Sequence, residues 1–258
     1  MIEFLLDTSV AIGLGVFVLI TISFSLIIYL FSSHLLKDHI NKKHEKMGRL
    51  LFRVAASLLA FILSISFANQ RVYYSKLQNA IEAEASAIVD LKIDLDFYQT
   101  AEANEVQDKI IDYVMQVSGD GWQSLQLNPL HSESIILFLE IYSDIQQLEP
   151  QTALQERLKG NMLSDIDKIS DYLELRLYSS KHEFSPLIYI SIFGLAAIMI
   201  LFTVYPPDRI TLLFLSIYVA FIGIVLYFIL MMSNPLRGPL QIEPGPFLLL
   251  KETIEAHR

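Results

Sequence analysis

The chain has 258 residues, of which 53% are hydrophobic and 18% carry a charge, and its formal net charge is −9. About a quarter of the residues of an ordinary soluble domain are charged, so this composition argues against a soluble globular protein and favours a membrane protein. The absence of cysteine excludes disulfides, thiolate catalysis and cysteine-ligated zinc.

Four apolar stretches lack Asp, Glu, Lys and Arg, and each is long enough to cross a hydrocarbon core about 30 Å thick, which takes about 20 helical residues. The four stretches are Thr8–Leu36, Val54–Gln70, Phe184–Pro207 and Ile210–Leu236. The residues before the first stretch are acidic rather than basic, which is unlike a cleaved secretory signal. We therefore expect four transmembrane helices, with the first retained as an anchor.

The polar segment between the second and third stretches has the apolar period of helices. One stripe comprises Leu77, Ile81, Ala85, Ile88, Leu91 and Leu95. A second stripe comprises Leu154, Leu158, Met162, Ile166, Ile169, Leu173 and Leu177. The first predicted helix continues from the second stretch without proline or glycine. The second predicted helix runs up to Pro186, a residue that the start of a helix tolerates. Shorter helices are expected at 103–117 and 132–148.

These patterns predict an all-α membrane protein with four transmembrane helices and a helical-bundle insert between helices 2 and 3. The expected parts are helices 1 and 2 with a basic loop (1–70), an acidic helical bundle outside the membrane (71–183), helices 3 and 4 (184–236), and a Pro/Gly ribbon with a short C-terminal helix (237–258). Pro235, Pro239, Pro244 and Pro246 remove backbone donors and fix φ between residues 231 and 247. We therefore expect this stretch to be extended, with Arg237 paired to a carboxylate or a lipid headgroup. The final residues are expected to form an amphipathic helix or an interfacial anchor.

Charge predicts an orientation in the membrane. The loop at 37–53 carries six Lys or Arg against two acidic residues, and short basic loops stay in the cytoplasm. The insert at 71–183 carries 20 Asp or Glu against nine Lys or Arg, a net charge of −11. The charge rule therefore places the insert and both termini on the non-cytoplasmic side.

Four phrases of the sequence carry a family resemblance: AEASAIVDL at 83–91, DYVMQVSGDGW at 112–122, LRLYSSKHEFSPLIY at 175–189 and NPLRGPLQIEPGPF at 234–247. From about Leu30 to its end, the chain resembles the bestrophin-like domain family of bacterial membrane proteins. The structural signature residues in these phrases are Glu84, Trp122, Pro186, Pro235, Arg237, Gly238 and Pro244. The chain departs from the family pattern at Gly121 and Asn234, where the family usually has acidic residues.

The resemblance implies a remote similarity to bestrophins, which are pentameric anion or cation channels with four spans per subunit and a helical insert. A homo-oligomer, a pentamer by this resemblance, would then lie in the bacterial inner membrane and pass small ions. Bestrophins have their insert in the cytoplasm, which is opposite to the orientation that the charge rule gives.

No pattern of an enzyme or a nucleic-acid-binding protein is present, so we predict no catalytic residue, no cofactor and no nucleic-acid partner. His34, His39 and His44 are five residues apart, which turns each about 140° from the last on a helix, so no metal site is expected there. Two acidic sets could bind a divalent cation: Asp90, Asp94 and Asp96, and Asp165, Asp167 and Asp171. Neither set has the glycine and terminal Glu of a calcium loop, which favours a solvated helix face.

The second transmembrane stretch carries a stripe of small, polar and aromatic residues at helical spacing. We interpret Ser57, Ala60, Phe61, Ser64, Phe67 and Arg71 as candidate pore-lining residues, with the two phenylalanines as an apolar gate. The alternative is that the small residues let helices pack closely, while Arg71 extends to the interface.

Two functions stay open. The first is an oligomeric bestrophin-like ion channel, cation or anion conducting, with its pore lined by transmembrane helix 2. Copies of the acidic insert would concentrate cations near their surface, within a Debye length of about 8 Å. The second is a non-conducting membrane-anchored scaffold or sensor that binds a protein partner through residues 71–183. A secondary transporter is disfavoured, since no span contains an ionisable residue at mid-membrane.

Overall fold

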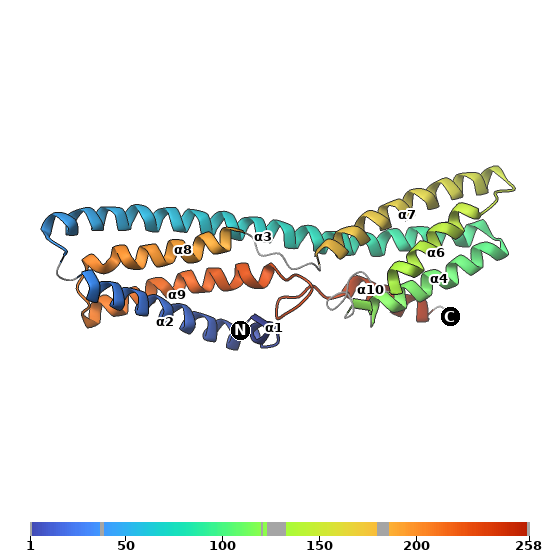
Figure 1. Ribbon diagram of the computed structural model, residues 1–258. Helices are drawn as coiled ribbons and strands as arrows, with labels where there is room; N and C mark the ends of the chain where they lie inside the picture. The colour runs from blue at the N-terminus through green and yellow to red at the C-terminus, as the bar shows by residue number, and fades with distance from the viewer. Residues whose placement is uncertain (1, 37–38, 120, 123–132, 180–185, 257–258) are drawn as a thin grey trace. The chain divides into compact units, whose positions relative to one another are not determined.

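The computed structural model describes residues 2–36, 39–119, 121–122, 133–179 and 186–256, and no β-strand occurs among them. The described helices run in the order α1 (Ile2–Leu6), α2 (Val10–Leu36), α3 (Lys42–Tyr98), α4 (Ala101–Ser118), α6 (Glu133–Gln147), α7 (Ala153–Ser179), α8 (Pro186–Leu201), the 3-10 helix η2 (Phe202–Val204), α9 (Arg209–Met232) and α10 (Gly245–Ala256) (Figure 1). The predicted all-α class is confirmed.

Among the described residues, four helices are long and apolar enough to cross a membrane: α2, α3, α8 together with η2, and α9. The four-span prediction is therefore confirmed. Helix α3 passes from residue 42 to residue 98 without interruption, as the absence of proline and glycine after the second span predicts. Pro186 is the first residue of α8, also as predicted. The junction between the second long helix of the insert and α8 falls at 180–185, outside the described residues.

The chain forms two compact units. The first comprises Met1–Tyr74 and Glu183–Gln241, and the second comprises Ser75–His182 and Ile242–Arg258. Helix α3 contributes residues to both. Helix α10 confirms the short helix expected near the C-terminus, and it packs on α4 through the buried side chains of Phe247, Leu250 and Ile254.

In the first unit, α2 packs against α8 and α9, and Figure 1 shows these three helices side by side. Tyr29 of α2 is fully buried among them, and its hydroxyl donates to the carbonyl oxygen of Tyr205 at 2.9 Å. Leu59 and Leu63 bring one face of α3 into the same apolar core. The membrane-spanning part of α3 therefore has a buried face and an exposed face.

The segment after α9 is a series of turns, so the expected extended ribbon is wrong. Backbone N–H groups of Asn234, Arg237 and Gln241 each donate to the carbonyl oxygen three residues earlier. Gly238 has a φ of 104°, and a Cβ atom there would lie 2.7 Å from Leu6 Cδ2. Only glycine accepts both conditions without strain, and it lets α1 pack against these turns.

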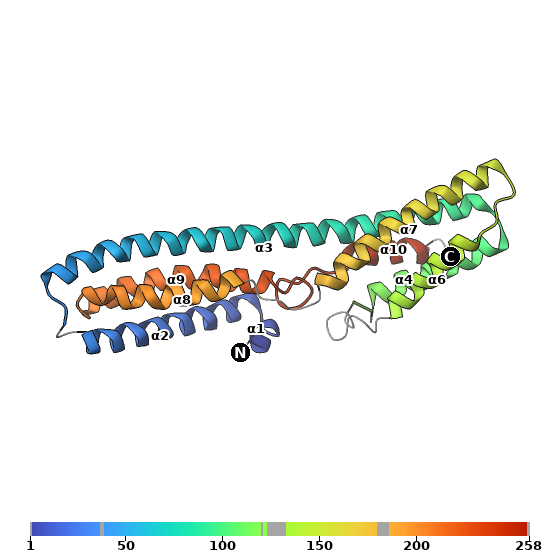
Figure 2. The same ribbon diagram turned by 45° about the horizontal axis from the view of Figure 1, so that its top comes forward.

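The second unit buries the stripes that the sequence predicts. All six α3 residues from Leu77 to Leu95 are buried, and Figure 2 shows α7 running beside this part of α3, with α4 and α6 next to each other. On α7 the stripe is correct from Leu158 to Leu173, but Leu154 is 50% exposed because it lies in the first turn of the helix. Leu177 is only half-buried.

Candidate functional site

The six residues predicted to line a pore all lie on the exposed face of α3. Ser57, Ala60, Phe61, Ser64, Phe67 and Arg71 are exposed, whereas Leu59, Leu63 and Ser66 between them are buried. Phe61 and Phe67 are 63% and 38% exposed. We call these six residues the α3 stripe.

The two serine hydroxyls of the α3 stripe are satisfied within α3 itself. Ser57 Oγ donates to the carbonyl oxygen of Arg53 at 3.0 Å, and Ser64 Oγ donates to that of Ala60 at 2.9 Å. Hydroxyls that bond back one helical turn let serine sit in a membrane-spanning helix without an unpaired donor. Their oxygen lone pairs stay free on the exposed face, where they could accept a hydrogen bond from water or contact a cation.

Part of the α3 stripe also lines an apolar groove of about 480 Å³ against α9. Ala60, Ser64 and Phe67 contribute from α3, and Tyr218 and Phe221 contribute from α9. The groove is therefore a feature of the first unit alone. It gives the exposed face of α3 a concave apolar surface.

A buried charge cluster lies in the second unit. Glu84 of α3 and Arg176 of α7 are both fully buried, and Arg176 Nη2 lies 2.9 Å from Glu84 Oε1. The Tyr113 hydroxyl of α4 donates to the same carboxylate oxygen at 2.6 Å and accepts from Arg176 Nη2 at 3.1 Å. This triad, the Glu84 cluster, joins three helices at one point.

Aromatic rings cover the guanidinium of the Glu84 cluster. The Arg176 Cζ atom lies 5.7 Å from the centre of the Trp122 ring and 5.6 Å from that of Phe247. A guanidinium stacks favourably on such ring faces when it is removed from water. Phe247 belongs to α10, so the cluster also helps to hold the C-terminal helix in the second unit.

Burial controls the protonation of the Glu84 cluster. Removal from water raises the pKa of Glu84, and the Arg176 guanidinium and the Tyr113 hydroxyl oppose that rise. Burial, together with the charge of Glu84, raises the pKa of Tyr113 well above 10.0. Tyr113 therefore remains a neutral hydrogen-bond donor at any physiological pH.

Glu84 was expected only as part of a family phrase, and Arg176 was not predicted as a site residue. A signal exists for both: Glu84 falls on the buried stripe of α3, three residues after Ile81, and Arg176 falls on that of α7, three residues after Leu173. A charged residue at an apolar position on each of two neighbouring helices indicates a buried ion pair.

The other structural signature residues have positional roles. Pro235 is buried in the turns after α9, and Pro244 precedes α10. Arg237 Nη2 lies 3.4 Å from Asp7 Oδ1, so of the two partners expected for Arg237 the structure shows a carboxylate.

Within the described ranges, no group of three or more His, Asp or Glu side chains is arranged to hold a metal ion.

Four apolar helices with a helical unit inserted between the second and third define a four-span helical membrane protein. The Bestrophin-like domain family model matches residues 19–247, so the chain belongs to the bestrophin-like family. No curated protein matches the sequence. The fold is similar to the crystal structure of a mutant bacterial bestrophin homologue from Klebsiella pneumoniae, with a TM-score of 0.65 and 13% identity, over 94% of this chain and 98% of that one.

We predict that Glu84→Gln destabilises the second unit by about 3 kcal/mol or more, because it leaves the Arg176 cation buried without a counter-ion. Thermal or denaturant unfolding followed by the fluorescence of Trp122, the single tryptophan, measures the effect. The matched control is Glu82→Gln, an exposed position two residues earlier on α3, which should change stability by less than about 0.5 kcal/mol. Equal effects of the two changes would contradict a buried ion pair.

A second prediction concerns alkaline pH. Because the folded-state pKa of Tyr113 lies above its ordinary value of 10.0, its contribution to stability is complete below pH 10 and is lost as pH rises further. The stability difference between the natural chain and Tyr113→Phe should therefore shrink above pH 10, by up to about 1.4 kcal/mol per pH unit. Unfolding curves recorded between pH 7 and pH 11 measure this, and parallel curves for the two proteins would contradict it.

Proposed function

We propose that this chain assembles into an oligomeric ion channel in which the α3 stripe lines the conducting path. The observation that carries the proposal is that a membrane-spanning helix keeps a face of serine, alanine and phenylalanine exposed while its opposite face is packed in the core. Around an axis, one such face from each copy suffices to build a pore wall. The family membership of the chain supports this function.

The chemistry of the α3 stripe suits ion passage. Ser57 and Ser64 supply hydroxyl oxygens that can replace part of the hydration shell of a cation. Phe61 lies between the two serines along α3, and Phe67 lies beyond Ser64. Rings of phenylalanine from several copies would form apolar constrictions that gate by excluding water. The excess of acidic residues at 71–183 supports a preference for cations over anions. On this proposal the chain is not an enzyme.

We infer that the loop at 37–53 faces the cytoplasm and that the second unit lies on the opposite side. The six basic residues of that loop support this orientation. Bestrophins have the reverse arrangement, so the orientation distinguishes the charge rule from the family resemblance. The pore proposal holds in either orientation.

The absence of cysteine makes the channel directly testable by single cysteine substitution. In vesicles containing Ser64→Cys protein, we expect a charged thiol reagent to reduce ion flux, because a charge placed in the path blocks it. Phe67→Ala should increase flux by widening an apolar constriction. The control is Ser23→Cys on the exposed face of α2, where the same reagent should leave flux unchanged. Vesicles that stay impermeable to both cations and anions would refute conduction and leave the scaffold function.

Orientation is tested in intact cells with a membrane-impermeant maleimide. Ser86 is exposed on the α3 segment of the second unit, and Lys43 is exposed at the start of α3. We expect Ser86→Cys to be labelled from outside and Lys43→Cys to be labelled only after the membrane is opened. The reverse labelling pattern would overturn the orientation and would indicate the bestrophin arrangement.

A further inference from the structure

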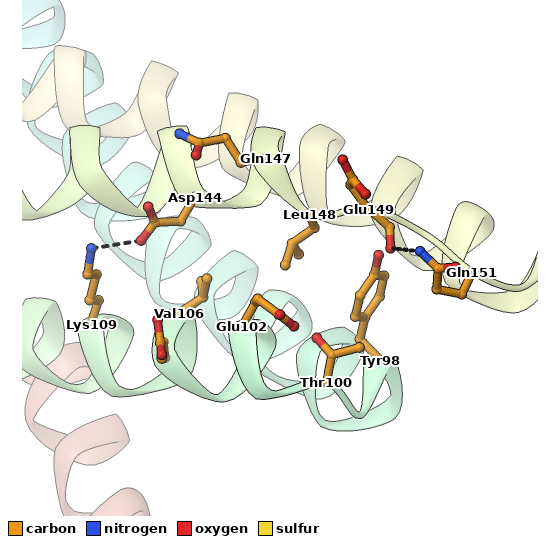
Figure 3. A pocket seen from close by; sticks show the side chains of 11 residues that line it. Tyr98, Thr100, Glu102, Val106, Lys109, Asp144, Gln147, Leu148, Glu149 and Gln151 are labelled. Carbon is orange, nitrogen blue, oxygen red and sulfur yellow. Dashed lines mark hydrogen bonds and ion pairs between the residues drawn. The ribbon is translucent and has the colours of Figure 1, made fainter.

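A polar cavity of about 530 Å³ lies in the second unit, between the first turns of α4 and the last turn of α6 (Figure 3). The side chains of Val106 and Leu148 are buried beneath it, and Tyr98 and Thr100 lie at one end. The cavity belongs to neither the α3 stripe nor the Glu84 cluster. Its residues therefore need a separate explanation.

Tyr98 supplies a buried polar group without a partner. The side chain is 1% exposed, its hydroxyl makes no hydrogen bond to the described residues, and Figure 3 shows it directed toward Glu149, just after α6. Burial raises the pKa of Tyr98, so its phenol stays neutral. Buried hydroxyls are nearly always hydrogen-bonded, so this one indicates that a polar group occupies the cavity.

Three carboxylates on the cavity are free to bind a cation. Glu102, Glu105 and Glu149 line it from exposed positions, and none of them forms an ion pair within the described ranges. Hydrogen bonds from its own backbone N–H and from Thr100 lower the pKa of Glu102, so this group is ionised at neutral pH. The fourth acid of the lining, Asp144, is already paired with Lys109 at 2.7 Å.

The protein's own lysines show which cation these surroundings accept. The Lys109 ammonium lies 2.7 Å from Asp144 and 3.3 Å from Glu140. The Lys159 ammonium donates to the carbonyl oxygens of Gln146 and Leu148, at 2.9 Å and 2.7 Å, at the end of α6. Oxygen atoms at and beside the cavity thus already bind ammonium groups of the chain, whereas no described cluster of acids is arranged for a metal ion.

The walls of the cavity are held in place before any ligand arrives. Gln155 donates to the carbonyl oxygen of Tyr98 at 2.9 Å and accepts from the backbone N–H of Gln151 at 2.9 Å. Thr100 Oγ1 accepts from the backbone N–H of Ala103 at 3.2 Å and so caps α4. A preformed cavity loses little entropy on binding.

We propose that this cavity binds an aliphatic polyamine. Ammonium groups of the ligand contact Glu102, Glu105 and Glu149, and the Tyr98 hydroxyl hydrogen-bonds the amine. The methylene chain of the ligand spans the distance between these carboxylates. The site is independent of the pore, and its test does not require conduction.

The test is calorimetric titration of the full-length protein in detergent with spermidine as the probe. Tyr98→Phe removes only the unpaired hydroxyl and should weaken binding about fivefold. The double change Glu102→Gln and Glu105→Gln should weaken it about tenfold or more. The control is the double change Glu82→Gln and Asp90→Asn on the exposed side of α3, which lowers the charge equally and should leave affinity within about twofold.

Three outcomes would overturn the proposal. Equal weakening by the control pair would mean that spermidine is attracted by the overall charge. Binding of Mg²⁺ as tight as that of spermidine, at equal ionic strength, would mean that the acids bind any cation. Unchanged affinity of Tyr98→Phe, with a melting temperature at or above that of the natural chain, would mean that the hydroxyl has no ligand.

Discussion

Helix α3 is an unbroken helix that carries an apolar segment and a polar segment along one backbone. In hydrocarbon every backbone N–H and C=O group must be bonded within the chain, and an uninterrupted helix meets that condition without help from its neighbours. Its core-facing side is fixed in each unit, by Leu59 and Leu63 in the first and by Leu77 and Ile81 in the second. The exposed face of the membrane segment follows from this constraint, and the proposed function depends on that face.

The Glu84 cluster makes a different contribution. Two opposite charges removed from water gain little net stability, because the loss of hydration offsets their attraction. Their geometry is nevertheless specific: one carboxylate oxygen accepts from both Tyr113 and Arg176, so α3, α4 and α7 can meet in only one register. We interpret the cluster as a device that specifies the packing of the second unit. Phe247 against Arg176 extends that specificity to the C-terminal helix.

The class, the four spans, the continuity of α3 and most of the buried stripes could be predicted from the sequence, because each follows from local composition or helical period. Contacts between distant segments could not. The pairing of Glu84 with Arg176 and the packing of α10 on α4 depend on which helices become neighbours, and a periodic pattern gives only the face that is buried. The turns at 233–241 were mistaken for an extended ribbon because proline excludes a helix but does not choose between these two alternatives. The cavity beside Tyr98 arises from the meeting of α4 and α6, and no local pattern indicates it.

The central claim is that the α3 stripe faces the axis of a ring of subunits. A density map of the purified protein in lipid nanodiscs tests it most directly, because it shows the number of copies and the direction of α3 side chains together. The account predicts a closed ring in which Ser64 and Phe67 point to a central path. A monomer, a dimer without an axis, or a ring whose α3 stripe points to lipid would contradict it.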